Sequence, residues 1–345
     1  MIKRNKKWAI LLALSAYVTV FSTATAYAEQ RTELVPMGYT VGISMTTDGA
    51  LVVGLAATEN GGAPSPAAQA GLLPGDLITA VDGVKVGSAA ELRALLSQHQ
   101  KDDLTLDVLR GEDKLQLTLC PNTASGAVEL GVWLRDSVAG IGTLTYYDPQ
   151  SGKYGGLGHG INDTDSGVLM PLGCGSIFKS VITDVKRGCA GEPGELCGSF
   201  DPMEQKGEIL SNTGCGIFGI FKGETPSAKA IPIAHADEIK LGEAVILCNT
   251  TGCEVEEFKV EITRVYKGDN SGRSLMLCVR DERLLERTGG IVQGMSGSPI
   301  IQNGRLVGAV THVLISNPSK GFGISIDNML EASDWNTANE ELPAA

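Results

Sequence analysis

The sequence is poor in basic and in aromatic residues. Its 345 residues include 28 Lys and Arg against 40 Asp and Glu, which gives a formal net charge of −12 at pH 7. This acidity argues against a nucleic-acid partner, because phosphate backbones are bound by clusters of basic side chains. Aromatic residues make up only 5% of the chain whereas glycine occurs 44 times, a balance that favours turn-rich β structure over helical bundles. The length suits about two domains.

The eight cysteines form no Cys-x-x-Cys pair and have no histidine at ligand spacing. A zinc site is therefore the weaker interpretation, and no metal or other cofactor is expected. Cys248 with Cys253, or Cys189 with Cys197, could close small disulfide loops outside the cytoplasm. Buried free thiols explain the same residues equally well.

The N-terminal apolar run is short for a transmembrane helix. It covers roughly 14 residues from Trp8 to about Phe21, fewer than the about 20 residues that span a bilayer. Four basic residues precede it and the small-x-small sequence Ala26-Tyr27-Ala28 follows it, which is the pattern of a secretory signal. We therefore predict export across the cytoplasmic membrane, with residues 1–28 as a cleaved signal peptide. The alternative is an uncleaved N-terminal anchor.

Residues 36–120 have the pattern of one compact module. Residues 51–55 form a buried-strand pattern, and Ser65 followed by Pro66 is typical of the start of a helix. Asp82-Gly83, between alternating apolar residues, is a strong hairpin signal. A capping box at residues 88–91 predicts a second helix, and two alternating strands complete the module.

One segment of this module resembles a known family. Ser-Pro-Ala-Ala-Gln-Ala-Gly-Leu-Leu-Pro-Gly-Asp at residues 65–76 is similar to the helix-to-strand corner of PDZ domains attached to bacterial proteases. The resemblance implies a site at which a peptide C-terminus adds as a strand and backbone amides hold its carboxylate. Its residues would be Thr40, Val41, Gly42 and Ile43. The alternative is a docking domain that packs on the remainder of the protein.

From Gly131 to about residue 330, short apolar runs are separated by glycine, proline and Asx residues. Many short strands with turn signals between them indicate an all-β barrel or sandwich. Only residues 327–332, close to the end, have a helical pattern. The chain is therefore expected to be mainly β, with small α content.

A glycine-rich turn at residues 294–299, Gly-Met-Ser-Gly-Ser-Pro, can expose the hydroxyl of Ser296. The amides of Gly294 and Ser296 could converge on one point and stabilise a tetrahedral oxyanion. The turn resembles the nucleophile loop of trypsin-like peptidases, with Met295 in place of Asp and Ser298 in place of the second Gly. An α/β-hydrolase elbow is disfavoured, because Gly-x-Ser-x-Gly is not matched.

A nucleophilic serine needs a base, and the chain has only four histidines. His159 lies among the four glycines of residues 155–160, a costly arrangement that makes sense where backbone passes close to a substrate. A structural histidine in a tight turn is the alternative. His99 falls at the end of a predicted helix, His235 lies in a stretch without a pattern, and His312 sits at the end of a strand, as a core or edge histidine would.

A carboxylate that orients the imidazole would complete a triad. The spacing does not choose among five candidates, which are Asp163, Asp165, Asp184, Asp201 and Asp281. Asp281 ends a predicted strand and could point into a cleft, although surface aspartates are common at such positions.

Several motifs together resemble the SpoIVB (stage IV sporulation protein B) peptidases. They are the glycine run around His159, Asp281 with residues 286–293, the loop at 294–299, the strand at 308–313 and Gly-Phe-Gly-Ile at 321–324. The resemblance covers nearly the whole chain and implies a chymotrypsin-like double β-barrel over residues 128–335. It also implies a Ser/His/Asp mechanism with Ser296 as nucleophile, His159 as base and Asp281 as the acid.

The family's role, carried over by this resemblance, is signalling proteolysis during spore formation. Such a peptidase is made in the forespore, crosses its inner membrane and acts in the intermembrane space close to a membrane. It cleaves itself near its N-terminus and then cuts the extracytoplasmic part of a membrane regulator. That cut releases an intramembrane protease, which activates a late sigma factor.

Two other functions are compatible with the motifs. The first is a PDZ-bearing, non-catalytic scaffold that binds a membrane partner. It is disfavoured because both the serine loop and the glycine-flanked histidine are intact. The second is an esterase that uses the same residues, which fits less well with a module that reads peptides.

Overall fold

The structure, a computed structural model, describes residues 32–56, 64–99, 103–122, 128–224, 226–266, 268 and 272–333. The predicted signal segment, residues 1–28, lies outside the described residues. In the described part of the chain, no helix is long and apolar enough to cross a membrane. Strands account for 54% of the structure and helices for 10%, so the prediction of a mainly β protein with small α content is confirmed.

The N-terminal module contains two helices and four strands. Its elements are α2 (Pro66–Gln69), β3 (Leu77–Val81), β4 (Val84–Lys85), α3 (Ala89–Gln98), β5 (Leu104–Arg110) and β6 (Asp113–Leu119). The Ser65 hydroxyl accepts a hydrogen bond from the Ala68 amide at the start of α2, and the Ser88 hydroxyl accepts one from the Glu91 amide at the start of α3. Asp82 and Gly83 have positive φ between β3 and β4, the conformation that a two-residue hairpin requires.

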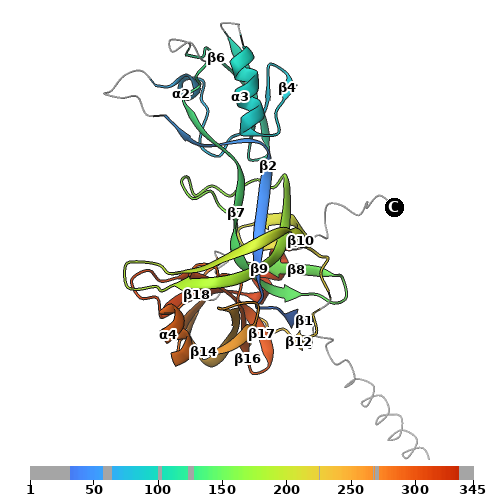
Figure 1. The fold of residues 1–345 in the computed structure, drawn as a ribbon, viewed down its shortest axis with the longest axis vertical. Coiled ribbons are helices and arrows are strands. Elements are labelled where there is room, and N and C mark those ends of the chain that lie inside the picture. The colour runs from blue at the N-terminus through green and yellow to red at the C-terminus, as the bar shows by residue number, and fades with distance from the viewer. Residues whose placement is uncertain are drawn as a thin grey trace, which may run out of the picture. The chain divides into compact units, whose positions relative to one another are not determined.

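Six strands form a first barrel outside the N-terminal module, with two short strands beside it. They are β2 (Thr40–Leu55), β7 (Val132–Tyr147), β8 (Lys153–Gly156), β9 (Cys174–Lys186), β10 (Glu195–Thr213) and β11 (Gly216–Phe221), with β1 (Glu33–Pro36) and β12 (Ile231–Pro232). The sheet runs β7-β8-β11-β10-β9-β2, and the pairing of β7 with β2 closes it. Both β2 and β7 continue beyond the barrel and remain paired with each other as far as the N-terminal module (Figure 1).

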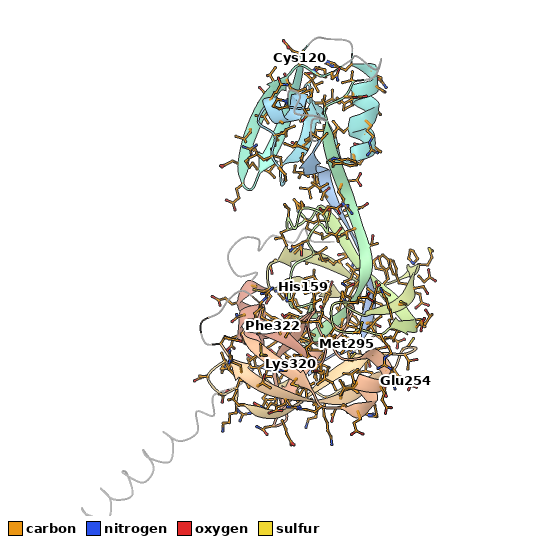
Figure 2. The ribbon with its side chains drawn as sticks, turned by 90° about the vertical axis from the view of Figure 1, so that its left-hand side faces the viewer. Cys120, His159, Glu254, Met295, Lys320 and Phe322 are labelled. Atoms are coloured by element: carbon orange, nitrogen blue, oxygen red, sulfur yellow. The ribbon has the colours of Figure 1, made fainter. Side chains whose placement is uncertain are left out.

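The second barrel is closed and has the order β13-β14-β15-β18-β17-β16. Its strands are β13 (Gly242–Asn249), β14 (Val255–Val265), β15 (Leu275–Val279), β16 (Pro299–Gln302), β17 (Arg305–Val313) and β18 (Lys320–Ser325), and its helices are α4 (Glu282–Thr288) and α5 (Ile326–Ala332). Met295, labelled in Figure 2, is fully buried and belongs to the same core cluster as Phe258 and Leu277. The side chain that replaces the trypsin-like aspartate thus anchors the serine loop by burial.

The segment Thr40–Ile43 does not lie at an open edge. Thr40 and Val41 pair with Thr143 and Gly142 of β7, while Val41 also pairs with Lys179 of β9. Both edges of this part of β2 are therefore occupied within the first barrel, and no edge remains for an added peptide. The sequence pattern suggested the start of a PDZ-type module here, whereas the structure uses these residues as a barrel strand.

Candidate active site

The serine loop is held from behind by β7. The Thr143 amide donates to the Ser296 carbonyl at 3.0 Å, and the Thr143 hydroxyl donates to the Gly294 carbonyl at 2.7 Å. The Thr145 hydroxyl donates to the Gly297 carbonyl at 2.8 Å. With these carbonyls turned toward β7, the amides of Gly294 and Ser296 have no acceptor among the described residues. The amide of Ser296 itself and that of Gly294, two residues earlier, are therefore available as donors for an oxyanion hole.

The ring of His159 is fixed by its own turn. Its Nδ1 lies 2.8 Å from the Gly160 carbonyl. A carbonyl can only accept, so Nδ1 carries the proton and Nε2 of the neutral ring holds the free lone pair. This is the tautomer that a general base needs. Burial lowers the pKa of His159 below its ordinary value of 6.5, and the Gly160 carbonyl opposes this shift.

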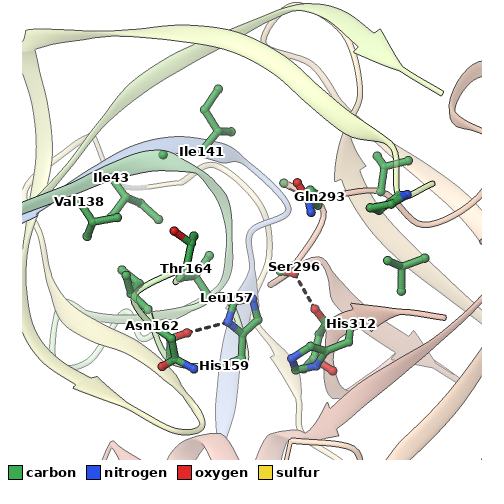
Figure 3. Close-up of a pocket in the computed structure, with 18 of the residues that line it drawn as sticks. Ile43, Val138, Ile141, Leu157, His159, Asn162, Thr164, Gln293, Ser296 and His312 are labelled. Atoms are coloured by element: carbon green, nitrogen blue, oxygen red, sulfur yellow. Dashed lines mark hydrogen bonds between the residues drawn. The ribbon is translucent and has the colours of Figure 1, made fainter. Parts of the chain in front are cut away.

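Ser296 does not yet point its proton at His159. Its hydroxyl donates to the Thr311 carbonyl at 2.6 Å. His312, the residue after Thr311, places its ring 5.1 Å from that of His159 (Figure 3). A contact between Ser296 and His159 requires the hydroxyl to leave the Thr311 carbonyl, and catalytic hydrogen bonds often tighten only when substrate is present.

Ser296, His159 and His312 face one cavity of about 520 Å³. Most of its remaining lining is apolar and includes Ile43, Val138, Ile141, Leu157, Ile161, Val292, Val313 and Ile315. Figure 3 labels the first four of these together with the polar groups. A mostly apolar pocket with a few convergent polar groups is typical of a ligand site. Among the described residues that line it, none carries a carboxylate.

Asp281 lies elsewhere, at the N-terminus of α4. Its carboxylate accepts hydrogen bonds from the amides of Arg283 and Lys259 at 3.1 and 3.2 Å, and the Arg283 guanidinium lies 2.9 Å away. The hydrogen bond from the Arg283 side chain is the largest influence that lowers the pKa of Asp281. Asp281 is therefore the N-cap of α4, and the structure does not place its carboxylate beside His159.

The other four carboxylates are also placed away from the base. Asp163 binds the Arg135 side chain at 2.6 Å, and so does Asp165. Asp184 and Asp201 accept from nearby backbone amides. The group that orients His159 is thus the backbone carbonyl of Gly160.

Comparison with known proteins identifies the family of the chain. The family described as SpoIVB peptidase S55 matches residues 126–330, which is more than half of the chain, and the PDZ domain family matches residues 60–110. The chain belongs to the SpoIVB peptidase S55 family. The double-barrel fold with a preceding PDZ domain is therefore confirmed, and the family places the chain among the serine peptidases.

The individual proteins that resemble this chain match only a small part of it or match it at low sequence identity. The Mesorhizobium japonicum protein mll0638, whose name is that of a zinc metalloprotease, is 34% identical over 79 residues, which are 23% of this chain and 22% of that protein. This chain thus spans less than a quarter of that relative. Among solved structures, the inactive form of the Rv3671c protease has a TM-score of 0.33 at 16% identity and covers 56% of this chain and 82% of its own. The active form, from M. tuberculosis, has a TM-score of 0.33 at 16% identity, with 59% and 77% covered.

Sequence reasoning did not find several groups of the S55 site. Thr143, Thr145 and Thr311 act through hydrogen bonds to or from the serine loop, and such contacts leave no pattern in a single sequence. The Gly160 carbonyl is backbone and has no signature at all. All eight cysteines are free thiols in the structure.

The site should lose both activity and stability as the pH falls. A histidine that acts as a base must be neutral, and because burial lowers the pKa of His159, we expect the acid limb of kcat/KM to lie below pH 6.5. Burial also lowers the pKa of His312 from 6.5 to about 4. Between pH 6.5 and about pH 4, His312 is protonated in the unfolded chain and neutral in the folded chain. The free energy of unfolding therefore decreases as the pH falls through this range.

Thermal unfolding of the wild type and His312→Phe at pH 7 and pH 5 tests this expectation. The variant should lose less stability between the two pH values than the wild type. An equal loss in both proteins would show that His312 does not contribute to the acid sensitivity.

Removal of the Asp281 carboxylate should affect folding more than chemistry. Asp281→Ala deletes the cap of α4 and removes one partner of Arg283, which keeps its hydrogen bond to the Glu257 carbonyl. We expect the change to cost about 1–3 kcal/mol of unfolding free energy. Denaturant unfolding measures this cost, and kcat is measured per folded molecule. We expect kcat within about threefold of the wild-type value, because Asp281 does not line the cavity. A loss of kcat of about a thousandfold with unchanged stability would instead assign Asp281 to the chemistry.

Proposed function

We propose that this S55 peptidase is a serine endopeptidase in which Ser296 is the nucleophile and His159 is the base. The observation that carries the proposal is the shared cavity, where Ser296 lies with two unpaired amides and with a histidine whose Nε2 is the free acceptor. The cavity supplies a nucleophile, a base and an oxyanion site, which are the parts that acyl transfer needs.

The proposed reaction forms an acyl-enzyme and then hydrolyses it. Ser296 Oγ attacks the carbonyl carbon of the scissile bond while its proton passes to His159 Nε2. The amides of Gly294 and Ser296 donate to the oxyanion of the tetrahedral intermediate. The Gly160 carbonyl accepts from Nδ1 throughout and stabilises the imidazolium. His159 then gives the proton to the leaving amine, and water hydrolyses the acyl-enzyme with the same base.

The biological role that we propose follows from family membership. It is signalling proteolysis in sporulation: the exported peptidase cleaves itself near its N-terminus and then cuts the extracytoplasmic region of a membrane regulator. Its place would be the forespore intermembrane space, close to a membrane.

The proposal is tested with reduced, carboxymethylated lactalbumin, an unfolded polypeptide, and with the small ester p-nitrophenyl acetate. We expect the protein to cut a few peptide bonds in lactalbumin, to shorten its own N-terminus, and to hydrolyse the ester poorly. Efficient ester hydrolysis without peptide cleavage would favour an esterase. Neither activity between pH 5 and pH 9 would favour the non-catalytic scaffold.

A further inference from the structure

We propose that the outer edge of β7 is a docking strand for the part of a polypeptide substrate that follows the cleaved bond. The substrate would add to β7 as an antiparallel strand, from Ile141 beside the active site toward Val132 beside the PDZ domain. This inference rests on the proposed function and names the kind of substrate: a chain that is extended over several residues after the cleavage site.

The outer edge of β7 is open over most of its length. One edge of β7 pairs with β2 from Val132 to Thr143. The opposite edge pairs with β8 only between Leu144 and Tyr147. Among the strands that the structure describes, none pairs with this outer edge over residues 132–141. A row of unpaired backbone donors and acceptors is a template for an added strand.

The hydrogen bonds of Thr143 show which backbone N–H and C=O groups of β7 point away from β2. Its amide donates to Ser296 and its carbonyl accepts from Leu157, so both groups point outward. The register between β2 and β7 is unbroken from Thr143 back to Ser137. Because successive residues of a strand point their backbone groups to opposite edges, Ile141, Ala139 and Ser137 also offer an N–H and a C=O outward.

Space for a chain exists beside this edge. Residues 138–141 of β7 line the same cavity as His159, Ile161 and Asn162. Residues 139–141 also line a second cavity of about 700 Å³, together with Gly294 and part of β10. An ideal Cβ on Gly140 would meet no atom within 4 Å. A polypeptide leaving Ser296 past His159 would therefore run along β7.

The direction in which the substrate would run along β7 follows from the position of the first residues of that strand. Val132 and Leu134 pack against the core of the PDZ domain, and Asp136 accepts a hydrogen bond from the Ala89 amide at the start of α3. A chain paired antiparallel to β7 has its C-terminal side toward Val132, and antiparallel pairing is slightly more stable per residue than parallel pairing. A substrate with its C-terminal side toward the PDZ domain runs antiparallel to β7, which puts the leaving amine next to His159. Residues 132–141 would span about 30 Å of extended substrate.

The test uses the full-length protein and a peptide built around the first bond that it cuts in carboxymethylated lactalbumin, with eight residues after that bond. Single N-methyl groups are placed at each of these eight residues in turn, and kcat/KM is measured for each peptide. Strand addition predicts losses of about tenfold at alternate positions only, because every second amide donates to β7. Losses that do not alternate, or no losses, would overturn the proposal.

A variant supplies the matching evidence from the protein side. Ala139→Pro removes an outward N–H and places a ring at the edge, while the pairing with β2 keeps its donors. The alternating losses of kcat/KM across the N-methylated peptides should be absent in Ala139→Pro. They should persist in Ala139→Val, which retains the N–H. An alternating pattern that survives in Ala139→Pro would place the substrate elsewhere. If the wild type does not cut lactalbumin, no peptide can be chosen and the proposed function itself fails, which is a distinct result.

Discussion

Ser296→Ala and His159→Ala should each lower kcat/KM for an unfolded polypeptide by about a thousandfold or more. The serine variant has no nucleophile. The alanine at 159 removes the base: among the described residues that line the cavity none carries a carboxylate, the Thr311 carbonyl cannot take up a proton at neutral pH, and His312, whose pKa burial lowers to about 4, is a weak base. Because the two residues act in one step, the double variant should be about as impaired as either single variant.

Ser298→Ala is the matched control for this pair. Ser298 lies in the same loop and is fully buried, and it is not among the residues that line the cavity. Its removal should leave cleavage close to the wild-type rate. If Ser296→Ala cuts lactalbumin as fast as Ser298→Ala does, Ser296 is not the nucleophile.

Gly297→Ala should disrupt the whole serine loop. Gly297 has φ of +97°, and an ideal Cβ there would lie 1.9 Å from the Thr143 carbonyl oxygen and 2.6 Å from the Leu157 nitrogen. Both neighbours are backbone atoms of barrel strands or of the turn that leads to His159, so neither can move without breaking the site. We expect a loss of more than about 3 kcal/mol of unfolding free energy, together with loss of cleavage.

The control for crowding is Gly304→Ala. Gly304 has a similar positive φ of +73°, but no atom lies within 4 Å of its ideal Cβ. Denaturant unfolding should show a cost of about 1 kcal/mol for this variant, from backbone conformation alone. Equal costs for the two variants would mean that the contact of Gly297 with β7 does not matter.

Local signals in the sequence were sufficient for the PDZ domain. Ser65 and Ser88 cap their helices and Asp82-Gly83 makes its turn, as predicted, because each depends on the chemistry of a few neighbouring residues. Thr40–Ile43 could not be placed in the same way. Its position depends on pairing with β7 and β9, which are distant in the sequence.

The same difference between local signals and contacts of distant segments applies to the active site. Ser296 and His159 stand in glycine-rich turns that a sequence displays, and the structure brings both to one cavity. The placement of Asp281 follows a simpler signal, an aspartate directly before the helical residues Glu282–Thr288, which is a preferred N-cap. The group that orients His159 is a backbone carbonyl, and every residue type carries one.

The most direct test of the account is to treat the protein with diisopropyl fluorophosphate and locate the modified residue by peptide mass spectrometry, in the wild type and in His159→Ala. We predict a single phosphorylated residue, Ser296, in the wild type and almost none in the variant, because the hydroxyl is nucleophilic only beside a base. Modification of another residue, or of Ser296 at the same rate in both proteins, would contradict the claim that His159 activates Ser296.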